Sequence, residues 1–141
     1  MPSPKYRTEV DPRFSDFDLQ GILNSRQYLD LIGEARVDQM RRCYHTPMED
    51  YTARGQTFVL RSLAIEYEKP IYYGSKFSIE TWIEEIKGPM AKVCFRFISP
   101  TDEVLYASGS GIYFLVDLNT KKPARFPENA VKAYLGIKES I

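Results

Sequence analysis

The hydrophobic pattern of the chain changes its period once, from helical to alternating. Between Asn24 and about Arg41, apolar residues recur at the three- and four-residue spacing of one helical face. From Thr57 onward, apolar and polar residues alternate as they do in half-buried strands. The residues that share the helical face are Tyr28, Leu31, Ile32 and Ala35. The pattern therefore predicts one long helix followed by a sheet.

Further apolar residues widen the face of this helix. Leu29, Val37 and Met40 lie outside the main stripe, so we expect a central helix that is covered on several sides. Asn24 is a favourable N-cap residue, and Gln27 three residues later resembles the second half of a capping box. We therefore expect the helix to begin at Asn24.

The alternating part of the chain predicts four antiparallel strands. Gly88-Pro89 and Pro100-Thr101-Asp102 are turn signals between them. Gly109-Ser110-Gly111 inside the last strand predicts a bend, or the close approach of another backbone. In the first run, Val59, Leu63, Ile65 and Tyr67 are expected to share one face of the strand. The four runs extend over Val59 to Tyr67, Phe77 to Ile83, Val93 to Phe97, and Val104 to Val116.

Two shorter elements complete the pattern. Alternation from Tyr6 to Val10 predicts a first strand, which Pro12 ends or confines to a sheet edge. A closing helix is expected near Glu128 to Leu135. This order predicts an α+β fold, with an antiparallel sheet of about five strands wrapped around one long central helix. Because such a sheet leaves its edges open, we expect dimerisation by edge pairing.

Length and composition limit the possible classes of protein. The 141 residues fit a single domain over 1–141, and the formal net charge of zero excludes a nucleic-acid binder that relies on bulk charge. We expect no membrane insertion and a cytoplasmic location, because no apolar run is long enough and the polar start is no signal peptide. His45 is the only histidine, which excludes zinc sites that need several imidazoles.

The candidate chemistry lies just before the long helix. Asp16 and Asp18 precede Gly21 and the predicted helix start. A carboxylate beside the free amide groups of a helix N-terminus can direct water onto a polarised carbonyl, which favours a hydrolase. Carboxylates in such a turn also serve as turn and capping groups, and Asp16 fits that structural role.

These residues resemble a known family. The stretch Asp16-x-Asp18-x-x-Gly21, then two apolar residues, four others and Tyr28, is similar to the hotdog-fold thioesterases, specifically the 4-hydroxybenzoyl-CoA thioesterase-like acyl-CoA group. Weaker matches at Tyr67-Glu68-Lys69-Pro70 and Tyr73-Gly74 extend the resemblance over about Tyr6 to Val116. The resemblance implies an acyl-CoA substrate, no cofactor, and a homo-oligomer, either a dimer or a homotetramer, with substrate between two subunits.

The resemblance also assigns roles to single residues. Asp18 matches the catalytic carboxylate of the family, and the Ser25 backbone N–H falls where the family polarises the thioester carbonyl. Gly21 belongs to the same motif and is a substrate-binding candidate. Some relatives carry histidine where this chain has Ile22, and others carry histidine or tyrosine where it has Ser25, so a mechanism that needs an imidazole is not expected here.

Three further residues are substrate-binding candidates with structural alternatives. Asn24 also fits an N-cap, and Tyr28 also fits the core, with its hydroxyl at the acyl pocket. An Asn24 cap would leave the Ser25 N–H free. Arg61 takes the apolar phase of its strand, where an unpaired charge is costly. It is expected to pair with a buried carboxylate, face a partner subunit, or contact a CoA phosphate.

These roles allow two mechanisms of thioester hydrolysis. Asp18 serves either as general base for water or as a nucleophile that forms a mixed anhydride. Hydrolysis of acyl groups on acyl carrier protein is an alternative function. A second alternative is a hotdog module that binds acyl-CoA without catalysis.

Overall fold

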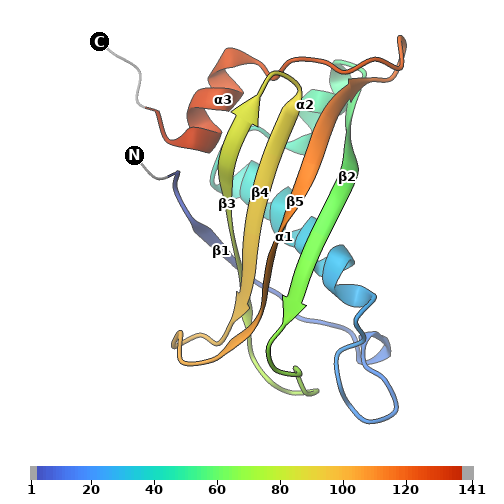
Figure 1. Cartoon of the computed structure of the whole chain (residues 1–141), viewed down its shortest axis with the longest axis vertical. Helices are drawn as coiled ribbons and strands as arrows, with labels where there is room; N and C mark the ends of the chain where they lie inside the picture. Colours follow the sequence, from blue (N-terminus) through green and yellow to red (C-terminus); the bar gives the residue numbers. More distant parts are fainter. Residues whose placement is uncertain (1–2, 138–141) are drawn as a thin grey trace.

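The computed structural model describes residues 3–137 and contains five strands and three α-helices in that part of the chain. A short 3₁₀ helix, η1 (Phe14–Asp16), precedes the first α-helix. Figure 1 shows the arrangement. The elements are β1 (Tyr6–Glu9), α1 (Gln27–Arg42), α2 (Met48–Ala53), β2 (Gln56–Tyr67), β3 (Ser78–Lys87), β4 (Met90–Ile98), β5 (Leu105–Asp117) and α3 (Glu128–Leu135).

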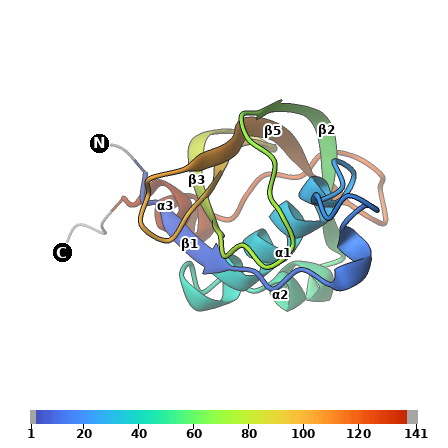
Figure 2. The ribbon, with the colours of Figure 1, turned by 90° about the horizontal axis from the view of Figure 1, so that it is seen from below.

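The strands form one antiparallel sheet in the order β1-β3-β4-β5-β2. The sheet curves over α1, which lies across its concave face (Figure 2). β1 and β2 are the two edges, and the predicted turns join β3 to β4 and β4 to β5. The predicted α+β class and the five-stranded sheet around one helix are confirmed, as is the closing helix.

Burial explains why α1 takes this place. Tyr28, Leu31, Ile32 and Ala35 are each at most 3% exposed, as the helical spacing predicted. Toward the start of α1 they pack with the aromatic and aliphatic side chains of β3 and β4. A second cluster surrounds Met40 at the other end, with side chains from α2 and α3. Burying each large side chain contributes about 1.5–3 kcal/mol, so the helix stripe and the sheet face stabilise each other.

Two expectations for α1 are wrong. The helix begins at Gln27 rather than Asn24, because the Asn24 side chain caps a turn one step earlier: its Oδ1 accepts a hydrogen bond from the Arg26 N–H at 3.2 Å. Of the three residues expected to widen the buried face, Met40 is buried, but Leu29 and Val37 are 39% and 41% exposed, so one side of the helix is not covered by the described residues.

A β-bulge in β2 overturns the predicted strand phase. The pairing with β5 shifts between Leu60 and Ser62, so Arg61 is the extra residue. Before the bulge, Phe58 and Leu60 have the partly buried positions, whereas Val59 is 46% exposed. Because one extra residue reverses the alternation, Val59 does not share a face with the residues after the bulge. Arg61 is exposed and does not occupy an inward position.

The glycines of β5 confirm the close approach that the sequence predicted. A methyl group at Gly109 would lie 2.9 Å from Phe95 Cζ and would overlap the carbonyl oxygen of Ala64 on β2. Only glycine leaves room for this contact. None of the helices in residues 3–137 combines the length and the apolar composition that crossing a membrane requires.

Candidate active site

A small hairpin presents the motif carboxylates beside the start of α1. The Asp18 N–H donates to the Ile22 carbonyl at 2.8 Å, and the Asn24 N–H donates to the Asp16 carbonyl at 2.9 Å. Gly21 closes the turn with a φ of +76°, a left-handed conformation that glycine adopts without strain. The glycine of the motif is therefore needed for the turn itself.

The hairpin is fixed to the segment between β2 and β3. The Leu23 N–H donates to the Ile71 carbonyl, and the Tyr73 N–H donates to the Gly21 carbonyl, each at 2.8 Å. The Tyr73 ring also meets the rings of Phe14 and Phe17 edge-on, with centroids 5.4 and 5.2 Å away. These contacts hold the motif in place although it lies outside the sheet.

Only one oxygen of the Asp18 carboxylate has a partner in the described part of the chain. Its Oδ1 accepts hydrogen bonds from the backbone N–H groups of Gln20 at 2.9 Å and Ile22 at 3.0 Å. Asp18 is exposed in the protomer. The side chain is thus oriented through one oxygen, and the second oxygen is available to a water molecule or a substrate.

The turn at Asn24 leaves an amide group available. Asn24 Oδ1 accepts from the Arg26 N–H, and the Asn24 carbonyl accepts from the Gln27 N–H at 2.9 Å. The structure records no acceptor among residues 3–137 for the Ser25 N–H. Ser25 is exposed at the positive end of the α1 dipole, which is a favourable place for a developing negative charge.

A hollow of about 300 Å³ adjoins Ser25. Ser25, Tyr28 and Tyr67 line it, together with Ile22 and Leu23. The rings of Tyr28 and Tyr67 meet edge-on at 5.0 Å, and the Tyr67 hydroxyl lies 3.5 Å from the Ser25 carbonyl. Burial raises the pKa of Tyr28 to about 12, with a smaller contribution from Tyr67. Tyr28 therefore stays neutral and can donate a hydrogen bond.

The structure brings together only some of the predicted site residues. Ser25 and Tyr28 share the hollow, whereas Asp18, Gly21 and Asn24 lie on the hairpin outside its lining. Arg61 is away from both, with its guanidinium 5.2 Å from the centre of the Phe114 ring. No carboxylate of residues 3–137 pairs with it, so the expected buried partner is not found.

Sequence reasoning missed Tyr67 as a site residue. Tyr67 takes the same strand face as Leu63 and Ile65 and stands directly before the connection that anchors the hairpin. The sequence indicated Tyr67 only by its position as the last residue of that inward-facing strand face. Its closeness to Ser25 depends on how β2 crosses the start of α1, which a single sequence does not reveal.

The hairpin, the free amide at the helix start and the curved sheet together define a hotdog-fold protein of the thioesterase type. The chain belongs to the thioesterase-like superfamily, whose family model matches residues 12–134. This membership confirms the family that the motif predicted.

Individual relatives agree with this assignment. The acyl-CoA thioesterase YbgC of Haemophilus influenzae is 25% identical over 125 residues, which cover 89% of this chain and 90% of the relative. Among solved structures, the DHNA-CoA thioesterase of Staphylococcus aureus has a TM-score of 0.84 at 22% identity, covering 94% of this chain and 90% of the other. Slr0204, a 1,4-dihydroxy-2-naphthoyl-CoA thioesterase from Synechocystis, has a TM-score of 0.85 at 16% identity, covering 97% and 100%. These structural likenesses establish the fold.

Proposed function

We propose that the protein is an acyl-CoA thioesterase of the cytoplasm, which hydrolyses an acyl-CoA thioester to the free acid and CoA. Family membership and the names of the relatives support a thioester hydrolase. The observation that carries the proposal is the Ser25 N–H at the start of α1, which has no acceptor among residues 3–137; Ser25 lines a hollow and follows the hairpin that carries Asp18.

The proposed chemistry needs only groups of this chain. The thioester carbonyl oxygen accepts a hydrogen bond from the Ser25 N–H, which stabilises the negative charge that develops on it. Asp18 either takes a proton from the attacking water or attacks the carbonyl carbon itself. In both forms the carbon–sulfur bond breaks and CoA leaves as a thiolate, which takes up the proton that the attacking water gives up. In the nucleophilic form this water reacts in a second step: it hydrolyses the mixed anhydride, which releases the acid and restores the Asp18 carboxylate. No metal or organic cofactor enters the reaction.

We further propose that a second copy of the chain completes the site. Asp18 is exposed in the protomer, and Leu29 and Val37 form an uncovered apolar strip on α1. A catalytic carboxylate works best where bulk water is excluded and only the reacting water remains. A homo-oligomer in which the partner covers this side of α1 would enclose the acyl group and leave the CoA nucleotide near the surface.

The substitution Asp18→Asn tests the role of the carboxylate. The asparagine carbonyl oxygen can still accept the hydrogen bonds from Gln20 and Ile22, so the turn is kept while the charge is lost. We expect kcat on acyl-CoA substrates to fall by about a hundred-fold or more, since general-base catalysis contributes about that much. Release of CoA thiol, followed with a thiol-detecting dye, measures the effect.

The control is Asp30→Asn, which removes an exposed carboxylate from the first turn of α1. It should leave the rate close to that of the wild type. Equal rates for Asp18→Asn and the wild type would contradict the catalytic role. Calorimetric binding of acyl-CoA without any thiol release would instead indicate a non-catalytic module. Faster hydrolysis of acyl groups on carrier protein than on CoA would favour the carrier-protein alternative.

A further inference from the structure

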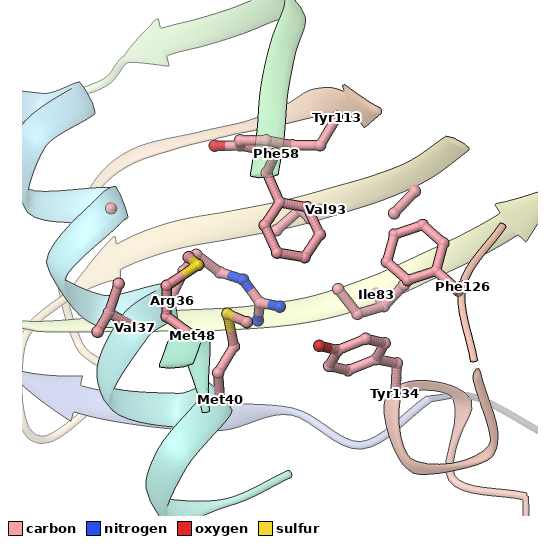
Figure 3. Close-up of a pocket in the computed structure, with 12 residues that line it drawn as sticks. Arg36, Val37, Met40, Met48, Phe58, Ile83, Val93, Tyr113, Phe126 and Tyr134 are labelled. Atoms are coloured by element: carbon pink, nitrogen blue, oxygen red, sulfur yellow. The ribbon is translucent and has the colours of Figure 1, made fainter. Parts of the chain in front are cut away.

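A second cavity, of about 150 Å³, lies inside the protomer at the far end of α1 from Ser25. Its walls come from α1, from the concave face of the sheet and from α2 and α3 (Figure 3). They are almost entirely apolar, with a major share from Met40, Met48, Phe58, Ile83, Val93 and Phe126. Such a lining suits the hydrocarbon part of a ligand, and the two methionines can adapt to its shape.

One charged side chain interrupts this apolar lining. Arg36 extends from α1 among the lining side chains, with its guanidinium on the side of Met40 and Tyr134 (Figure 3). Its Nη1 donates to the Thr81 hydroxyl at 3.0 Å, and its guanidinium lies 5.4 Å from the centre of the Tyr44 ring. A guanidinium has five N–H donors; one is used by Thr81, and the Tyr44 hydroxyl is close enough for a hydrogen bond from Arg36 to lower the pKa of Tyr44.

Arg36 also has no acidic partner in the described chain. The salt bridges of residues 3–137 do not include it, and Asp38, an acid on the same helix, pairs with Arg42 at 2.9 Å. A partly buried cation without a counter-ion is costly in an apolar site. Arg36 therefore lines the cavity as a cation with no carboxylate partner among residues 3–137.

The Tyr44 side chain next to Arg36 also has an unusual environment. The Tyr44 hydroxyl is buried and makes no hydrogen bond of ordinary geometry in the part of the chain that the structure describes. Burial raises the pKa of Tyr44, and the nearby Arg36 guanidinium offsets part of that rise. Tyr44 lies outside the cavity lining, and its ring and hydroxyl are next to the Arg36 guanidinium.

In the protomer the cavity also opens toward the side of α1 that we propose a second copy covers, where the acyl group would lie. Gly33 and Val37 line it on α1; Val37 is 41% exposed, and a methyl group on Gly33 would meet nothing within 4 Å. Glycine in the middle of a helix lowers stability relative to alanine, so helix formation does not explain why position 33 is glycine. The missing side chain leaves open space beside Gly33. It leaves a gap on the uncovered side of α1, about 9 Å along the axis from Gln27 at the helix start.

We propose that this cavity binds a carboxylate carried on an apolar chain, with the chain among the lining side chains and the carboxylate on the Arg36 guanidinium. Two sources supply such a group. One is a free carboxylic acid, the product class of thioester hydrolysis. The other is the far end of an acyl group that carries a second carboxylate, and this source rests on the proposed function.

Binding of sodium decanoate and of decanol to the full chain tests the proposal. The two ligands have the same chain and differ in the charged end. Calorimetry should show decanoate binding at least about ten-fold more tightly than decanol, as expected for hydrogen bonds to a charged group. Arg36→Met should remove that difference and Arg36→Lys should keep part of it. Arg41→Met, an exposed arginine of the same helix, should behave as the wild type.

Equal affinities of the wild type for decanoate and decanol would overturn the proposal, and so would the absence of binding by either. Undiminished decanoate binding by Arg36→Met would overturn it as well. The comparison of the two ligands on the wild type needs no variant, so a folding defect in Arg36→Met cannot leave the question open.

Hydrolysis of decanoyl-CoA and decanedioyl-CoA then separates the two sources. A KM at least about ten-fold lower for decanedioyl-CoA, lost in Arg36→Met, assigns the cavity to the far end of the acyl group. Equal KM values, with decanoate binding intact, assign it to the free acid. If neither thioester is hydrolysed, the proposed function fails while the decanoate result still decides the cavity.

Discussion

Glu80 is a buried carboxylate held between two arginines. It is 5% exposed, and its two oxygens accept hydrogen bonds from Arg96 Nε at 2.8 Å and Arg7 Nε at 2.9 Å. Burial alone would raise the pKa of Glu80, but the hydrogen bonds from Arg96 and Arg7 outweigh it and hold the pKa below the ordinary value of 4.5. The group therefore joins β1 and β4 to β3 by charge as well as by backbone hydrogen bonds.

This carboxylate should make stability depend on pH. Because the pKa of Glu80 is lower in the folded protein than in the unfolded chain, the charged group stabilises the fold at pH values above the unfolded pKa. This contribution is lost as the pH falls through the pKa of the folded protein. We expect Glu80→Gln to lower the free energy of unfolding by about 1.5–3 kcal/mol at neutral pH, the usual contribution of a hydrogen bond to a charged group. Below pH 4.5 the difference between variant and wild type should shrink. Urea denaturation across the pH range measures both.

Glu84→Gln is the matched control for this prediction. Glu84 lies on the same strand and pairs with Lys92 at 2.8 Å, but it is exposed. Exposed pairs contribute little, so its loss should hardly change stability. A constant difference between Glu80→Gln and the wild type down to the acid limit would show that the charge of Glu80 is not the cause.

At the scale of the elements, two glycines inside regular secondary structure have opposite effects on stability. Gly109 allows β2 and β5 to approach, whereas Gly33 lies in α1 with open space around it. We expect Gly109→Ala to destabilise the fold by about 1–3 kcal/mol through overpacking. Gly33→Ala should stabilise it by about 1 kcal/mol, because alanine favours the helix. Thermal melts of both variants, which should move in opposite directions, check the pair.

The elements themselves were largely predictable from one sequence. The spacing of Tyr28, Leu31 and Ile32 identified the helix face, and alternation identified the strands, because each element buries one face. The short helix α2 escaped prediction, since six residues carry too little periodicity. The helix start was misplaced because an asparagine turn and an N-cap have the same sequence signal.

The phase of β2 and the grouping of the site were not predictable in the same way. A bulge at Arg61 adds one residue and leaves no mark that alternation can detect, so Val59 was assigned to the wrong face. The hairpin of Asp18 was recognised from its motif. The hollow beside Ser25 depends on Tyr67, which reaches it only because β2 ends above the start of α1.

For the whole molecule, the two sheet edges differ in their protection. β1 has four residues and is soon followed by Pro12, which cannot donate to a sheet ladder. β2 has twelve residues and forms the opposite edge, with Val59 46% exposed (Figure 1). A long edge with exposed apolar side chains favours pairing with another strand. Among the two edges, β2 is therefore the one on which we expect a second copy to pair.

The substitution Val59→Lys tests this assembly and its link to function. A charge on the long edge should oppose strand pairing, so light scattering should show a smaller mass than for the wild type. Because the proposed site is completed by a second copy, hydrolysis of acyl-CoA should fall together with the mass. Leu105→Lys places the same charge at an exposed leucine at the start of β5 and should change neither. A monomeric wild type that hydrolyses acyl-CoA, or a dissociated Val59→Lys protein with full activity, would show that one protomer is sufficient and that Asp18 works exposed.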